Sequence, residues 1–191
     1  IAASLSSCTD GNQTIDINNN SISGCQKGVT LNAYAYSATG EMSYLMRDNT
    51  ITSNDGTGIR ISASSSSANL VLNFDLGTLT DSGNNTIYSN GGNPSVNGGS
   101  SSSSYEIYVE NNSSLSSVEI PAYGNDWNTS DLAVIEDSIY HKVDDSMLME
   151  VLFDAGSPLP PGPPVAVYDT RTPTDCGPLV IDVADNDLDV N

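Results

Sequence analysis

The chain has 191 residues, of which 37% are hydrophobic and 15% charged, and its polar bulk is Ser, Thr, Asn and Gly. That composition is typical of a secreted β protein with many turns. With 24 acidic against 5 basic residues, the formal net charge is -19, which argues against nucleic-acid binding and against an anionic membrane surface, because both need clustered Lys and Arg. The sequence also lacks an apolar stretch of about 18 residues, so no membrane insertion is expected.

The N-terminal residues carry no basic segment followed by an apolar one, so no secretory signal peptide is indicated. We expect the chain to be a mature or excised part of a longer protein, extracellular or on the cell surface. Two of the three cysteines, Cys8 and Cys25, lie about one turn of a repeat apart. A disulfide between them is therefore expected in an oxidising compartment, which leaves Cys176 as a free thiol or an intermolecular link.

A degenerate repeat, marked by the tripeptide N-[ST]-I, runs along the chain. Its units share an Asn, a β-branched apolar residue, a Gly/Asn/Ser corner and an alternating strand. The apolar residue is Ile22, Ile51 or Ile87, and Trp127 takes its place in a fourth unit, which gives spacings of 29, 36 and 40 residues. Such a period, drifting because of polar inserts, predicts a solenoid of β coils.

The strand segments of these units alternate apolar with polar residues, so one set of side chains should face the core of each coil. The residues expected there are Val29, Leu31, Ile59, Ile61, Ile107 and Val109. Two low-complexity inserts, 62–69 and 91–104, are expected to be loops on one side of the solenoid.

The asparagines beside the apolar anchors have a predicted structural role. If Asn20, Asn49, Asn85 and Asn125 occupy the same corner of successive coils, their amides can bond to one another along the stack. Asn also tolerates the left-handed conformation that a sharp corner needs. The alternative is that these are ordinary turn asparagines.

The segment from Gly124 to Asp145 holds the only Trp and the only His of the chain. A helix is predicted over about residues 130–143, with a capping side chain at its start and one apolar stripe that faces inward. The stripe consists of Leu132, Ile135, Ile139 and Val143. Laid against the last coil, this helix would cover the apolar end of the solenoid.

The coils NNNSISGCQKGVTLNA and RDNTITSNDGTGIRISA resemble those of right-handed parallel β-helix proteins, the pectate-lyase-like superfamily. The resemblance extends to YGNDWNTSDLAVIEDSIYHKVDDSMLMEVLF, which is similar to the C-terminal element of many bacterial members: Gly beside Asn and Trp, a short helix, an Asp-Asp pair and a final strand. The predicted fold class is therefore all-β, a right-handed parallel β-helix over residues 1–156 with a C-terminal capping helix.

The resemblance implies that catalysis would need a groove on one parallel sheet, lined by carboxylates with Ca²⁺ and an Arg base or by paired acids. Arg60 lies on a predicted strand without an Asp pair on neighbouring coils. His141, Asp144 and Asp145 form a sparse set, because one His cannot build a His-rich metal site and adjacent acids on a helix do not face each other. We interpret the set as a helix end and polar cap, and expect Trp127→Ala to unfold the last coils but His141→Ala to change little.

A Pro-rich linker is predicted over 157–164, followed by a β segment over 165–191. The stretch DTRTPTDCGPLVIDVADNDLDVN resembles the opening of cadherin-like or bacterial immunoglobulin-like repeats. The segment is thus either the start of such a domain or a strand donated to another subunit in self-assembly. Its alternating acids Asp185, Asp187 and Asp189 can converge on Ca²⁺, with simple solvated acidity as the alternative.

These observations favour a non-catalytic, structural or adhesive segment of a larger surface or filament protein. One alternative is a β-helix that binds or degrades polysaccharide with catalytic coils outside this segment. Another is a filament subunit that assembles through its C-terminal strand.

Overall fold

The computed structural model describes residues 1–7, 12–35, 40–65, 70–91, 105–111 and 115–155. The chain divides into two compact units, Ile1–Ser157 and Pro158–Asn191, and all described residues belong to the first. The predicted linker and the predicted β segment after it therefore lie outside the described residues.

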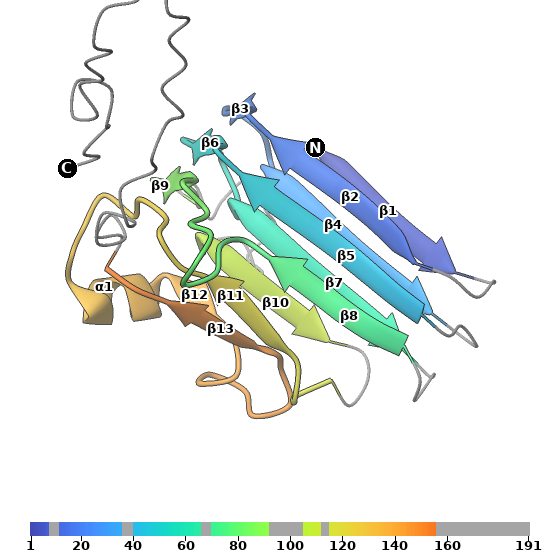
Figure 1. Cartoon of the computed structure of the whole chain (residues 1–191). Coiled ribbons are helices and arrows are strands. Elements are labelled where there is room, and N and C mark those ends of the chain that lie inside the picture. The colour runs from blue at the N-terminus through green and yellow to red at the C-terminus, as the bar shows by residue number, and fades with distance from the viewer. Residues whose placement is uncertain (8–11, 36–39, 66–69, 92–104, 112–114, 156–191) are drawn as a thin grey trace, which may run out of the picture. The chain divides into compact units, whose positions relative to one another are not determined.

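The longest sheet, called sheet A here, has five parallel strands that come from successive passages of the chain. Each strand pairs with the one that follows it a full turn later, so the order in the sheet is the order in the chain. Figure 1 shows these strands side by side. They are β1 (Ala2–Ser7), β4 (Val29–Ala35), β7 (Ile59–Ser65), β10 (Ile107–Asn111) and β12 (Ile139–Tyr140).

The other described strands stack in the same manner. Sheet B contains β2 (Gln13–Asn18), β5 (Gly40–Arg47) and β8 (Leu70–Asp75), and sheet C contains β3 (Ser21–Ile22), β6 (Thr50–Thr52) and β9 (Thr86–Tyr88). Two later strands, β11 (Glu119–Ala122) and β13 (Glu150–Phe153), pair with each other. The result is a parallel β-solenoid of about four turns, which confirms the predicted all-β fold class.

The register of the strands follows the predicted repeat. Ile22 pairs with Ile51 and Ile51 with Ile87, and a parallel bridge between Thr86 and Asp126 brings Trp127 next in the column. The six residues predicted to face the core are fully buried. The sequence spacing between these residues therefore varies because successive turns differ in length, while the stacked positions stay in register.

The capping helix is shorter than predicted, since α1 spans only Leu132–Asp137. Asp131 caps its start by accepting a hydrogen bond from the Ala133 N–H at 3.0 Å. Ser138 follows it, and Ile139 then joins sheet A beside Ile107. Because the chain leaves the helical conformation so early, residues at helical spacing do not share one face.

The predicted inward stripe is accordingly wrong at both of its ends. The side chains of Leu132 and Val143 are 53% and 71% exposed, whereas Ile135 and Ile139 are buried. Ile135 is the only buried residue of α1, and Ile139 is buried as a strand residue. The cap therefore combines one helical contact, a short strand and the buried ring of Trp127, which lies 6.3 Å from the Phe153 ring in an edge-on arrangement.

Candidate functional site

Four asparagines form a continuous hydrogen-bonded column at the corner between sheets B and C. The side-chain amide of Asn20 donates to Asn49 Oδ1 at 3.0 Å, that of Asn49 to Asn85 Oδ1 at 2.8 Å, and that of Asn85 to Asn125 Oδ1 at 2.9 Å. The backbone N–H of each donor residue, Asn20, Asn49 and Asn85, also donates to the oxygen that accepts its side-chain amide. We call this column the first ladder.

The left-handed residue at this corner lies one position before each ladder asparagine. Asn19, Asp48 and Asn84 have φ of 56°, 57° and 50°, and Gly124 has φ of 66° before Asn125. The expectation that the ladder asparagine itself adopts this conformation is therefore wrong. A single left-handed residue turns the chain sharply enough, so the next side chain points into the stack.

A second ladder, which the sequence analysis missed, runs along the next corner. The Cys25 N–H donates to Asn54 Oδ1 at 3.1 Å, and the Asn54 side-chain amide donates to Asn90 Oδ1 at 2.7 Å. The pattern N-T-I-x-S-N, which occurs at both 49–54 and 85–90, is the signal that could have revealed it.

Glu106 ends the second ladder. Its Oε1 accepts the Asn90 backbone N–H at 3.1 Å and its Oε2 accepts the Asn90 side-chain amide at 2.5 Å. Burial raises the pKa of the Glu106 carboxyl above its ordinary value, although hydrogen bonds from Asn90 and from the Ser89 backbone act in the opposite direction. Among the described basic side chains, none forms an ion pair with this carboxylate.

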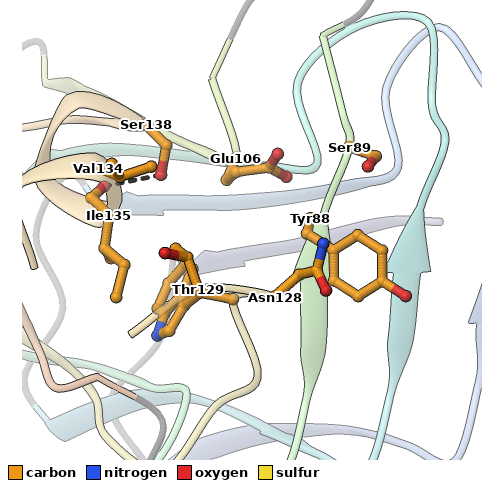
Figure 2. Close-up of a pocket in the computed structure, with 9 residues that line it drawn as sticks. Tyr88, Ser89, Glu106, Asn128, Thr129, Val134, Ile135 and Ser138 are labelled. Carbon is orange, nitrogen blue, oxygen red and sulfur yellow. Dashed lines mark hydrogen bonds between the residues drawn. The ribbon is translucent and has the colours of Figure 1, made fainter. Parts of the chain in front are cut away.

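A pocket of about 230 Å³ lies beside Glu106, between the third turn of the solenoid and the cap. Figure 2 shows Val134, Ile135 and Ser138 on one side of this space and Tyr88 and Ser89 on the other. The pocket is also lined by Trp127, Asn128 and Thr129, which follow Asp126, the residue bridged to Thr86 of β9.

The raised pKa of Glu106 leads to a prediction about pH. The folded protein holds this proton more tightly than the unfolded chain, so the carboxyl makes the free energy of unfolding fall as pH rises above its ordinary pKa of 4.5. A Glu106→Gln variant should lack this decrease, so its free energy of unfolding relative to the wild type should increase as pH rises from about 4.5. Urea unfolding at several pH values tests this, and two parallel stability curves would contradict it.

A cluster of three tyrosines, called the tyrosine face here, lies on the outer side of sheet A at its last strands. The ring centroids of Tyr108 and Tyr140 are 5.0 Å apart and stacked, and Tyr105 lies 5.4 Å from Tyr140 and 6.0 Å from Tyr108. Because side chains alternate, the neighbours of Tyr108, Ile107 and Val109, point into the core. The rings therefore form an aromatic patch on the outer surface.

Charged groups border the tyrosine face. Arg60 pairs in register with Tyr108, and its guanidinium forms an ion pair with Glu110. Burial raises the pKa values of both Tyr105 and Tyr108; the nearby Asp144 carboxylate adds to the effect on Tyr105. Arg60, considered above as a possible base, is thus engaged with a carboxylate.

His141 is a buried residue of the cap; a structural role was expected from the sequence, but its burial was not. Its side chain is 2% exposed; Nδ1 accepts the Val151 N–H at 3.0 Å, so Nε2 carries the proton toward Glu136 Oε1 at 2.9 Å. Asp144 accepts the backbone N–H of His141 instead of facing its ring. The expectation that His141 is dispensable does not fit these contacts.

Asp145 completes the same turn, because its Oδ1 accepts the Met147 N–H at 3.0 Å. No group of three His, Cys, Asp or Glu side chains in the described part of the chain could hold a metal ion. The Ca²⁺ candidates Asp185, Asp187 and Asp189 lie outside the described residues.

The expected disulfide remains a prediction, because Cys8 lies outside the described residues, as does Cys176. Cys25 is half-buried, with its sulfur 3.5 Å from the Ser23 carbonyl oxygen.

Comparisons with protein-family models, with curated proteins and with solved structures find no match to this chain. The parallel β-solenoid thus follows from the strand register of the chain itself. No helix within the described ranges has the length and apolarity that a membrane crossing requires.

Proposed function

We propose that this chain is a non-catalytic, extracellular, adhesive segment of a larger surface protein, and that it binds glycan through the tyrosine face. In this proposal it is a right-handed parallel β-helix of the pectate-lyase-like superfamily, followed by the start of a cadherin-like or immunoglobulin-like repeat. The observation that carries the proposal is the packing of Tyr105, Tyr108 and Tyr140 on the outer side of a rigid sheet.

Such a face suits a sugar ring for physical reasons. A pyranose has an apolar face of C–H groups that can stack on an aromatic ring, and its hydroxyls need fixed polar partners around that contact. Arg60 and Glu110 supply a donor and an acceptor at the border of the tyrosine face. The rings are already packed against one another, so little side-chain freedom is lost on binding.

The carboxylates of sheet A favour binding without turnover. Glu110 is the only acidic residue in its described strands, and it is held in an ion pair with Arg60. Hydrolysis of a glycosidic bond generally uses two carboxyl groups that flank the bond. Asp144, a second carboxylate near Tyr105, accepts the backbone N–H of His141, so both carboxylates near the tyrosine face already have partners.

The proposal predicts that Tyr108→Ala weakens glycan binding by about tenfold or more, equivalent to about 1.4 kcal/mol. Tyr108 is the test position because its ring stacks on Tyr140 and the residue pairs in register with Arg60. Binding of the whole chain to a panel of immobilised neutral and acidic polysaccharides provides the measurement. Tyr123→Ala, in which the replaced tyrosine is half-buried outside the tyrosine face, serves as the matched control.

Two results would argue against this function. Equal binding by the wild type and Tyr108→Ala would remove the tyrosine face as the binding site. Release of reducing or unsaturated sugar ends from any bound polysaccharide would show catalysis, and the non-catalytic part of the proposal would fail.

A further inference from the structure

We propose that the pocket beside Glu106 binds the ammonium group of a small organic cation. This site is separate from the tyrosine face and does not depend on glycan binding. It lies at the junction between the second ladder and the cap, and its lining includes Glu106, Tyr88, Trp127 and Ile135.

Glu106 brings a negative charge to the pocket. The residue is half-buried, and within the described chain no Lys, Arg or His side chain is paired with its carboxylate. Its hydrogen bonds come from the neutral amide groups of Asn90 and Ser89, which leave part of its acceptor capacity free. A desolvated carboxylate without a countercharge gains most from a cationic donor.

The lining of the pocket combines aromatic and aliphatic residues. Tyr88 and Trp127 are the aromatic ones, with most of the Trp127 ring buried in the cap, and Val134 and Ile135 are the aliphatic ones. Aromatic faces attract an ammonium group by cation–π interaction, and the aliphatic surface suits a short alkyl chain. A pocket of about 230 Å³ has room for a short alkylammonium ion.

The residues around the pocket favour an organic cation over a metal ion and over a neutral ligand. A hard divalent ion needs several oxygen ligands, and the described residues provide no group of three acidic, His or Cys side chains. A neutral alcohol would leave the charge of Glu106 uncompensated. The net charge of -19 also raises the local concentration of cations around the protein.

The test uses the whole chain at pH 8, with n-butylammonium chloride as the probe and n-butanol as its neutral counterpart. Trp127 is the only tryptophan and lines the pocket, so its fluorescence and its indole N–H signal in NMR spectra both report on occupancy. We expect a saturable change with n-butylammonium and an affinity for n-butanol at least tenfold weaker. Glu106→Gln should weaken n-butylammonium binding at least tenfold, while its single amide oxygen can still accept one of the two Asn90 donors.

Glu119→Gln is the matched control, because it removes one exposed carboxylate elsewhere in the solenoid. If Glu119→Gln weakens binding as much as Glu106→Gln does, the attraction is general and the proposal is wrong. Equal binding of n-butanol, or no saturable change in either signal, would also overturn it. Tyr108→Ala should leave n-butylammonium binding intact, so failure here and failure of the glycan proposal are distinguishable.

Discussion

Replacing Asn85 with alanine is expected to lower the free energy of unfolding by roughly 3–5 kcal/mol, since several buried polar groups lose their partners at about 1–3 kcal/mol each. Asn85 is fully buried at the centre of the first ladder. Its Oδ1 accepts two N–H groups of Asn49, and its amide donates to Asn125 Oδ1 and to the carbonyls of Met46 and Leu76. Urea unfolding followed by circular dichroism measures the loss.

Asn20→Ala is the control for that experiment. Asn20 is the first member of the same ladder and is only half-buried. It donates to Asn49, but no earlier asparagine of the ladder donates to its own side-chain oxygen. A loss below about 1 kcal/mol is expected, the usual net value of one hydrogen bond. Equal losses for the two variants would mean that the ladder does not act through buried amides.

His141→Ala is expected to cost about 2–4 kcal/mol, because it creates a cavity and leaves a buried N–H without an acceptor. The imidazole joins two elements of the cap, since it accepts the Val151 N–H of β13 and contacts Glu136 of α1. We expect loss of the buried environment of Trp127, and so a shift of its fluorescence, at a lower urea concentration than in the wild type.

Lys142→Ala is the matched control for the cap. The Lys142 side chain, next to His141 in the sequence, is 38% exposed and forms a salt bridge with an equally exposed Glu150. A change below about 1 kcal/mol is therefore expected. If His141→Ala unfolds at the same urea concentration as Lys142→Ala, the imidazole does not hold the cap together.

The stacking register could be predicted from the sequence because it depends on a local pattern that each turn repeats. Every turn places an apolar residue two positions after an asparagine, so the alignment of Ile22, Ile51, Ile87 and Trp127 follows from spacing alone. Burial of the alternating strand residues follows from the same register. These features need no knowledge of what lies between the turns.

The cap could not be predicted as well, because its contacts depend on a change of conformation inside one apolar pattern. Leu132, Ile135 and Ile139 have helical spacing, yet Ile139 gains more by joining the edge of sheet A beside Ile107. The spacing does not reveal that competition. The burial of His141 also escaped prediction, since its acceptor role for Val151 depends on how β13 returns to the cap.

The candidate sites depend on residues that are distant in the sequence. Tyr140 meets Tyr105 and Tyr108 only because β12 adds to sheet A. Glu106 ends the second ladder although a long insert of unrelated composition separates it from Asn90 in the sequence. No local motif marks either meeting, so the structure was needed to find them.

The two ladders also have an electrical direction. In both columns one N–H of each linking amide donates to the following turn, and the side-chain carbonyls accept from the turn before, so the carbonyl dipoles share one direction. The second N–H of the buried amides donates back to a backbone carbonyl of the preceding turn. The N–H ends point toward the cap, which gives that end partial positive character, opposite to the sense of an α-helix relative to its chain direction. In the second ladder that end meets Glu106, so the partial positive charge of the aligned amides faces the carboxylate, although no basic side chain of the described residues pairs with it.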